Sequence, residues 1–593
     1  HRVYSILRSA EIRGIIDTGL QVRPYATSTV LSHLNTIDRS TQISQSEKQL
    51  VRELIEELAR TEHTDNDMAS MLRYGSHRTY SETLDTTAEF GARLNFQYAQ
   101  SLVDADIFDW RNGGDFYLRG DIGSIASFHM NIGIRFDHVD YRIFLKNDFT
   151  IPTEGKYDTF WNHGGEHLLY YGIYNTPELS ISLLDDNLRF RWASIQRDWG
   201  VGTNNFMLSG SARSFNGVEL AYDISPWLRY AFITGALGKS ALKEGIPSNF
   251  EDYLREYHFS DYLHGTQYEN NFTAHRVELD LPYNFTFGIY ESVIYRKRFE
   301  FGYLNPLSVL MFEQNTMGDF DNMLAGVDIE WKFPGVLRAY GSAATTEMNE
   351  INPKRFFISP RNILSFQGGV DINLPFFTFS SATLQYTYVA PFFYTHYPHT
   401  EKVIIGYEYD VDNDEYIPIY ETQITEELSY VNKGENLGYP LRPNSDEILF
   451  SVDINALNGW DGNLTVKYQR RSGQYGFNID KFMRYAAANA EAYEAKDFSG
   501  NLFEKTVGIQ GTINKTLSSA PIRFSASYVC IMNSRRVNDP IPTYIWEGGV
   551  KKEVIDPDEI DYVETPVVEY EVSGPWAPWT FSHALQIGVS IWY

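Results

Sequence analysis

The sequence predicts an all-β transmembrane protein, a large antiparallel outer-membrane β-barrel of about 16–18 strands with a small N-terminal helical subdomain on the periplasmic side. From about residue 86 onward, large apolar residues alternate with polar ones, which is the period of a strand with two different faces. These segments run for about 9–13 residues, longer than typical strands of a soluble sandwich, as a lipid-facing band requires. No stretch approaches the roughly 18–20 apolar residues of a transmembrane helix.

The composition narrows the class of protein further. The chain has 593 residues, with 77 Asp and Glu against 50 Lys and Arg and a net charge of −27. This acidic balance argues against nucleic-acid binding, which needs a basic surface. A single Cys excludes a disulfide framework and a Cys-based zinc site. Aromatic residues make up 15% of a chain whose mean hydropathy is only −0.34. Strands that interleave apolar and polar side chains explain both values.

The first part of the chain has the period of helices instead. An apolar stripe recurs every three to four residues between positions 3 and 10. Ser44, followed three residues on by Glu47, has the pattern of a capping box at a helix N-terminus. We therefore divide the chain into a periplasmic helical subdomain at 1–75, which would serve as a plug, and a barrel at 76–593 with long extracellular loops.

The final segment, 581–593, alternates most regularly and stops on an aromatic residue. It resembles the terminal strand of bacterial outer-membrane proteins, whose alternate apolar residues are read by the barrel-assembly machinery. The corresponding residues here are Leu585, Ile587, Val589, Ile591 and Tyr593. The segment predicts a bacterial outer-membrane location. The start of the chain has no basic region followed by an apolar one, so we expect that a signal peptide is absent from this chain.

Three groups of residues carry a family resemblance. They are Arg197-Asp198-Trp199-Gly200-Val201-Gly202, then Tyr303-Leu304-Asn305-Pro306 with Asp321-Asn322 and Gly326-Val327-Asp328, and Val3-Tyr4-Ser5-Ile6-Leu7 with Arg23-Pro24-Tyr25. Together they resemble the capsule-assembly (Wzi) family of outer-membrane barrels, although that family usually has Pro where Val201 stands. The structural motif residues are Trp199, Gly200, Gly202, Pro306, Asn322 and Asp328.

The resemblance implies a barrel of about eighteen strands, closed from the periplasmic side by helices. It also implies a surface lectin that holds capsular polysaccharide on the cell. The resemblance implies no catalytic residues in this sequence. Independently of the family, Gly200 and Gly202 predict a tight turn beside a strand, where glycine supplies a positive φ or a close backbone approach. A dinucleotide-binding loop needs a third glycine and a following helix, and this segment has neither, so we do not expect it to bind a dinucleotide.

Two motifs contain the residue types of metal sites. Asp410, Asp412, Asp414 and Glu421 have the spacing of a calcium loop, but Glu415 replaces its essential glycine. The alternative is the tip of an acidic β-hairpin, and we expect no cofactor apart from Ca²⁺ at this loop. The segment 163–167 matches an inverted zinc-protease motif, yet its two adjacent glycines oppose the required helix and favour a turn.

Four aromatic residues in loop-like stretches are candidates for stacking on sugar rings: Trp161, Tyr407, Tyr409 and Trp546. The alternative is that such residues belong to the aromatic girdles at the membrane interfaces, where Trp and Tyr are enriched in membrane proteins.

Three functional hypotheses remain open. The first is a non-enzymatic role in attachment, assembly or export of capsular or surface polysaccharide, with lectin-like glycan binding by extracellular loops. The second is a porin for small solutes, whose luminal charges set selectivity. The third is a structural subunit of a larger complex with other outer-membrane or periplasmic proteins. Outer-membrane lipid is a partner in all three and nucleic acid in none. The sequence contains no nucleophile elbow or P-loop, so we predict that it is not an enzyme.

Overall fold

The computed structural model describes most of the chain. The described residues are 2–17, 21–23, 25–58, 77–81, 86–123, 125–140, 156–163, 167–239, 269–296, 298–317, 321–348, 352–354, 356, 362–375, 377–391, 393–396, 399–410, 415–426, 428–432, 435–472, 502–517, 520–540, 544–547, 550–553 and 570–592. The predicted C-terminal residue Tyr593 and the predicted calcium ligands Asp412 and Asp414 lie outside these ranges.

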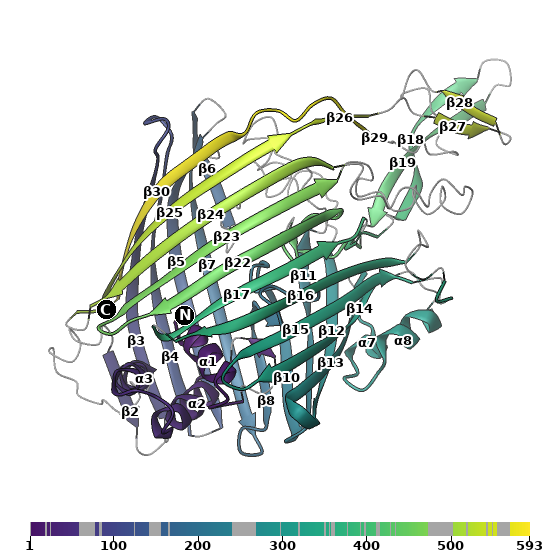
Figure 1. The fold of residues 1–593 in the computed structure, drawn as a ribbon. Coiled ribbons are helices and arrows are strands. Elements are labelled where there is room, and N and C mark those ends of the chain that lie inside the picture. Colours follow the sequence, from purple (N-terminus) through teal and green to yellow (C-terminus); the bar gives the residue numbers. More distant parts are fainter. Residues whose placement is uncertain are drawn as a thin grey trace.

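Within the described residues, eighteen strands close into one antiparallel barrel (Figure 1). In chain order they are β3 (Thr86–Ser101), β4 (Phe108–Ile122), β5 (Ala126–Asp140), β7 (His167–Leu183), β8 (Leu188–Ile195), β10 (Phe215–Ser225), β11 (Leu228–Lys239), β12 (Glu269–Leu281), β13 (Phe285–Arg296), β14 (Asn322–Phe333), β15 (Leu337–Glu347), β16 (Ile363–Leu374), β17 (Thr378–Val389), β22 (Ser445–Asn455), β23 (Trp460–Ser472), β24 (Leu502–Thr516), β25 (Ile522–Arg535) and β30 (Thr580–Trp592). The ring closes where β3 pairs with both β4 and β30. The predicted fold class and strand number are confirmed.

Two shorter strands extend the wall. β2 (His77–Ser81) pairs with β3 beyond the end of β30, and β6 (Lys156–His163) pairs with β7 beyond the end of β8. β2 continues the pairing of β3 where β30 has ended, and β6 continues the pairing of β7 where β8 has ended. The edges of β3 and β7 therefore stay paired.

The alternation in sequence becomes two faces of the wall. On β3, Leu94 and Phe96 are 39% and 45% exposed and point outward, while the intervening residues face the lumen. On β30, Leu585 and Ile587 are likewise exposed on the outer face. Because side chains alternate in a strand, each strand offers an apolar surface to lipid and a polar one to the interior.

The two ends of the barrel differ in their connections. At one end the strands are joined by tight turns, for example 184–187, 334–336 and 456–459. Left-handed residues make these turns, among them Asp186 (φ 66°) and Gly335 (φ 80°). The connections at the other end are long and carry the hairpins described below. Short turns are periplasmic in bacterial outer-membrane barrels, which orients the molecule.

Three helices precede the barrel: α1 (Val3–Ile12), α2 (Thr27–Arg39) and α3 (Gln45–Leu58). The predicted capping box forms at α3, where the backbone N–H groups of Glu47 and Ser44 each donate to the other residue's side chain, at 3.3 and 2.7 Å. The helices lie at the short-turn end (Figure 1), where the Gly335 N–H donates to the Ile12 carbonyl oxygen at 2.8 Å. None of the helices that the structure describes is long and apolar enough to cross a membrane.

Candidate functional site

A segment between β8 and β10 crosses the lumen and carries the predicted Trp-Gly-Val-Gly motif. Its strand β9 (Asp198–Trp199) pairs with β1 (Val22–Arg23), the strand before α2. Trp199 is 1% exposed. Gly200 has φ +141°, and a Cβ there would lie 2.4 Å from the Asn205 side chain. The predicted turn with an obligatory glycine is confirmed.

Side chains from the inner wall hold this segment by its backbone. Arg338 of β15 donates to the Val201 carbonyl oxygen at 2.7 Å. Gln385 of β17 accepts from the Thr203 N–H at 2.9 Å and donates to the Thr203 carbonyl oxygen at 3.0 Å. A Cβ on Gly202 would lie 2.4 Å from the Gln367 side chain, so this glycine permits the close approach. The segment is therefore a fixed part of the lumen.

Around it lies a buried apolar cluster. Phe206, Met207 and Leu208 from the crossing segment pack with Phe272 and Tyr290 of the wall. The connection between β17 and β22 adds further buried rings and aliphatic side chains: Phe393, Tyr394, Leu428, Tyr430, Leu437, Tyr439 and Leu441. Packing of this kind in the middle of a barrel obstructs the lumen.

Buried charges line the wall on the side that faces the helices. Arg276 binds Glu278 at 2.6 Å and Asp328 at 2.5 Å. Arg338 binds Asp371 at 2.7 Å and is 3% exposed. Lys332 binds Glu11 of α1 at 2.8 Å. These pairs place the family-motif residue Asp328 in a luminal network, and they attach α1 to the inner wall.

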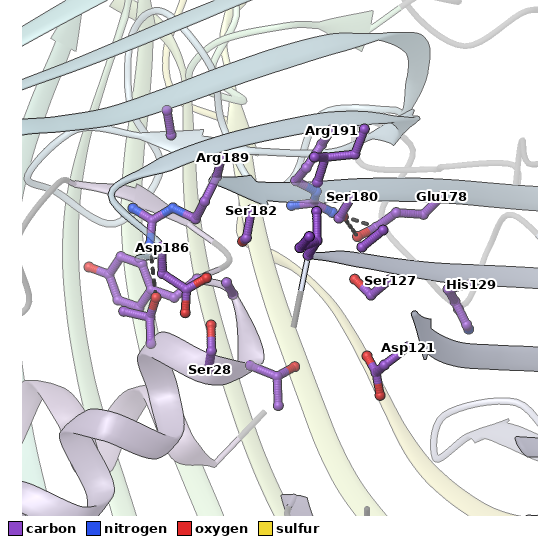
Figure 2. Close-up of a pocket in the computed structure, with 18 of the residues that line it drawn as sticks. Ser28, Asp121, Ser127, His129, Glu178, Ser180, Ser182, Asp186, Arg189 and Arg191 are labelled. Atoms are coloured by element: carbon purple, nitrogen blue, oxygen red, sulfur yellow. Dashed lines mark hydrogen bonds and ion pairs between the residues drawn. The ribbon is translucent and has the colours of Figure 1, made fainter. Parts of the chain in front are cut away.

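Below the cluster, a cavity of about 820 Å³ lies between the start of α2 and the inner faces of β3, β4, β5, β7 and β8. Figure 2 shows hydroxyl, carboxylate and guanidinium groups converging on it. The labelled lining residues are Ser28, Asp121, Ser127, His129, Glu178, Ser180, Ser182, Asp186, Arg189 and Arg191. The cavity reaches the turn residue Asp186, so it lies at the periplasmic end of the barrel.

Each arginine of this cavity has a carboxylate partner. Arg191 binds Glu178 at 2.5 Å, and Arg189 binds Asp223 at 2.9 Å. Arg189 also donates to the Thr29 hydroxyl of α2 at 2.9 Å. The lining holds seven carboxylates and four arginines besides its hydroxyls, so it offers many donors and acceptors and an excess of negative charge, which disfavours anionic ligands. This chemistry suits a polar, hydroxyl-rich ligand better than a strongly charged one.

One further hydrogen bond connects α1 with the segment before α2 beside the cavity. The Tyr25 N–H donates to the Tyr4 hydroxyl oxygen at 2.8 Å. Burial raises the pKa of Tyr4 above its ordinary value, so the phenol stays protonated and the helices keep a neutral contact here.

The four predicted sugar-stacking residues lie in strands rather than loops, which corrects the prediction. Trp161 belongs to β6 in the barrel wall. Tyr407 and Tyr409 belong to β18 (His399–Asp410), which forms a hairpin with β19 (Glu415–Glu426), and Trp546 belongs to the hairpin of β27 (Tyr544–Glu547) and β28 (Val550–Glu553). Trp161 lies in a strand because β6 pairs with β7 of the wall, and the other three lie in strands because their segments form two separate hairpins.

The hairpin of β18 and β19 projects beyond the barrel at its long-connection end (Figure 1). Tyr407 is 61% exposed, and Tyr416, directly opposite Tyr409, is 69% exposed. Residues opposite one another or two apart share a face. Tyr407, Tyr409 and Tyr416 therefore belong to one face of the hairpin. The sequence prediction missed Tyr416, because only the pairing register connects it to the other two.

The register removes Glu421 from the predicted calcium loop, whereas an ion at the tip itself stays a prediction, because Asp412 and Asp414 lie outside the described residues. Asp410 pairs with Glu415 at the tip, whereas Glu421 pairs with Val403. Glu421 is thus six residues along an extended strand from the tip, about 20 Å away at a rise of roughly 3.3 Å per residue. One ion cannot bridge that distance. Among the described residues, no group of three or more His, Cys, Asp or Glu side chains is arranged to hold a metal.

The remaining predicted positions are structural. Asn322 is 1% exposed and donates to the Leu428 carbonyl oxygen at 2.7 Å, and Pro306 accepts a hydrogen bond from Tyr230. His163 and His167 are paired ends of β6 and β7, and residues 164–166 of the predicted turn lie outside the described residues. Arg189, Arg191, Arg276 and Arg338 were not among the predicted site residues, although their place on the polar face of each strand was a usable signal.

The closed luminal packing and the eighteen-strand wall define an outer-membrane β-barrel protein. No protein-family model matches the sequence, and the search of curated proteins gave no match. Among solved structures, the fold is similar to Wzi of Escherichia coli, described as an outer-membrane protein involved in group 1 capsule assembly and as a carbohydrate-binding β-barrel. That match has a TM-score of 0.52 and 11% identity over 100% of this chain and 98% of that one. The resemblance predicted from the motifs is confirmed at the level of the fold.

Two further matches are OccK8 (OprE) of Pseudomonas aeruginosa and OccAB4 of Acinetobacter baumannii. Their TM-scores are 0.39 and 0.36, with 8% and 7% identity. Each alignment covers 85% of this chain and 97% of the other.

Proposed function

We propose that this protein is a non-enzymatic outer-membrane barrel that binds surface or capsular polysaccharide through the hairpin of β18 and β19. The observation that carries the proposal is the hairpin face on which Tyr407 and Tyr416 are exposed outside the barrel, with Tyr409 at a register position on the same face. Aromatic side chains combine a large apolar face with a polar tip, as sugar rings do. The carbohydrate binding of the E. coli barrel of similar fold supports the same class of ligand.

The luminal packing favours this proposal over the porin alternative. Tyr394, Tyr430 and Tyr439 are all at most 1% exposed in the middle of the barrel, where a solute channel needs water-filled space. We further propose that residues 1–75 close the periplasmic end as a plug, held by contacts such as Lys332 to Glu11. The role as a structural subunit of a larger complex stays a prediction, and co-purification from native membranes tests it.

The partners in this proposal are outer-membrane lipid, the surface glycan and, during insertion, the barrel-assembly machinery acting on β30. Outer-face residues such as Leu585 and Ile587 support the last of these. No cofactor is required, because the tyrosine face needs no ion to contact a sugar ring. Binding should therefore persist in EDTA.

The test is binding of the host strain's extracted surface polysaccharide to the full chain in detergent, with dextran as a neutral comparison. The double variant Tyr407→Ala/Tyr416→Ala should weaken binding roughly tenfold or more, about 1.4 kcal/mol or above. The control Tyr283→Asn removes a tyrosine that is 86% exposed at the periplasmic end, where Asn tolerates the φ of 66°. Unchanged binding in the double variant, or normal surface glycan in a deletion strain, would refute the proposal.

A second variant locates the binding surface. Ser180→Trp would fill the periplasmic cavity without touching the hairpin. Loss of binding in this variant, with normal binding in the double tyrosine variant, would move the site from the hairpin to the cavity.

A further inference from the structure

The connection between β13 and β14 lies against the outer side of the wall. Figure 1 shows its helices α7 (Phe301–Leu304) and α8 (Leu310–Met317) beside β13 and β14, outside the ring of strands. The register agrees with this placement. Glu291 pairs with His275, and His275 with Phe232. All three point outward, because Ile289, two residues from Glu291, is 48% exposed on the outer face.

These outward-facing side chains of β12 and β13 are nevertheless buried. His275 is 6% exposed, Val293 is fully buried and Tyr295 is 2% exposed. Tyr303 of α7 and Leu310 of α8 are fully buried against Val293 and Tyr295. The connection therefore forms a second layer over the wall.

Polar groups on the outer face hold this layer. The Glu291 carboxylate accepts hydrogen bonds from the backbone N–H groups of Leu310 at 2.9 Å and Met311 at 3.4 Å. The Tyr230 hydroxyl donates to the Pro306 carbonyl oxygen. A carboxylate on the lipid side of a barrel is costly unless it is satisfied. The free N–H groups at the start of α8, together with its helix dipole, provide that satisfaction.

Part of the backbone of the connection is paired within the connection, as a lipid environment favours. The N–H groups of Leu304, Asn305, Ser308, Phe312 and Glu313 donate to carbonyl oxygens within the connection, and that of Leu307 donates to the Asn305 side chain. Pro306 has no N–H to satisfy.

The exposed surface of the connection carries large apolar side chains, beside the exposed polar residues Asn305, Asn315 and Thr316. Leu307 is 88% exposed, Phe301 75% and Phe312 63%. This surface continues the lipid-facing residues of β14, where Val327 and Ile329 are 42% and 50% exposed.

The position of a residue along β13 indicates how deep that residue lies in the membrane. The stacked pair Phe285 and Trp331, with ring centroids 5.6 Å apart, lies near the periplasmic turns, where an aromatic girdle is expected. Glu291 is six residues further along β13, about 20 Å along the strand and about 15 Å in height at a tilt of roughly 40°. The apolar band is about 25 Å tall, so Glu291 lies within it.

We propose that residues 298–317 form a membrane-embedded lateral hairpin, which contacts lipid acyl chains through its apolar surface and is fixed to the wall by Glu291. The occupant of the apolar surface is lipid, since the surface is continuous with the lipid-facing band and lies at its depth. This inference is independent of any glycan binding.

Site-directed spin labelling in proteoliposomes tests the proposal on the full chain. Cys530, the single cysteine, is first replaced by Ser. Labels are then placed by Leu307→Cys on the lateral hairpin, by Ile289→Cys on the outer wall, and by Tyr283→Cys in a periplasmic turn. The Leu307 label should collide with oxygen and be shielded from a soluble nickel chelate, as the Ile289 label is. Access to the chelate like that at Tyr283 would place the segment in water and overturn the proposal. Shielding from both reagents with spin–spin broadening would identify a second copy as the occupant and overturn it too.

The role of Glu291 is tested with the same label. Glu291→Ala should increase the mobility of the Leu307 label, whereas Glu291→Gln keeps a carbonyl oxygen acceptor and should restore much of the order. Equal spectra in all three proteins would show that Glu291 does not fix the lateral hairpin.

Discussion

Arg338 and Val201 are joined across the barrel lumen, where the guanidinium donates a hydrogen bond of 2.7 Å to the carbonyl oxygen. The same guanidinium binds Glu330 and Asp371 of the inner wall. One buried side chain therefore connects the charge network of the wall to the segment that crosses the lumen.

We expect Arg338→Met to destabilise the barrel strongly. The substitution leaves Glu330 and Asp371 buried without this partner, and breaking such a pair costs about 3–5 kcal/mol. The measurement is urea unfolding in detergent micelles. The control is Arg523→Met, because Arg523 is 32% exposed and binds Asp461 at 3.0 Å, where the loss should be about 1 kcal/mol or less. Equal losses of unfolding free energy in the two variants would contradict the role of Arg338 as the buried partner of Glu330 and Asp371.

Gly200→Ala should loosen the crossing segment. The φ of +141° and the approach of Asn205 leave no room for a Cβ, so we expect a cost of about 1–3 kcal/mol. Limited proteolysis within the segment and the unfolding midpoint report the change. Gly341→Ala serves as the matched control, since its Cβ would meet only ordinary contacts at 3.8 Å. A Gly200→Ala protein as resistant as this control would count against the rigid turn.

The N-terminus of α3 should weaken in acid. Burial opposes ionisation of Glu47, but hydrogen bonds from Ser44 and Arg13 prevail and hold its pKa below the ordinary value. A lowered pKa means that the charged group stabilises the fold above the unfolded pKa, about 4.3, and that this contribution is lost as the pH falls through the folded value. Hydrogen-exchange protection of 45–58 should therefore fall at low pH.

The variant Glu47→Gln provides the check on that pH dependence. It should lower protection at neutral pH by an amount corresponding to about 1 kcal/mol or less, and it should flatten the acid dependence. Glu56→Gln, at an exposed position of the same helix, should keep the dependence. If the acid transition persists in Glu47→Gln, another group is responsible.

The full chain should not conduct ions in planar bilayers, with a general porin as the positive control. A variant lacking residues 2–58 should stay closed as well, because the buried members of the cluster around Phe206, Tyr394 and Tyr430, apart from Val22, come from the barrel's own strands and connections. Conductance of the full chain would restore the porin hypothesis. Conductance only after truncation would show that the helices alone close the lumen.

The sequence by itself determined the features that depend on neighbours in the chain. Alternation along β3 and β30 assigned the lipid and lumen faces, because successive side chains in any strand point to opposite sides. The capping box of Ser44 and Glu47 and the glycine turn at Gly200 are local in the same way, since each needs only a few consecutive residues.

Tertiary structure decided whatever depends on register and on the paths of long connections. Pairing brought Tyr416 to the same hairpin face as Tyr407 and separated Glu421 from Asp410. It also placed Glu291 on the outer wall, where α8 covers it. The physical reason is that hydrogen bonds between strands join residues far apart in the chain, and a shift of one residue would turn every side chain to the other face.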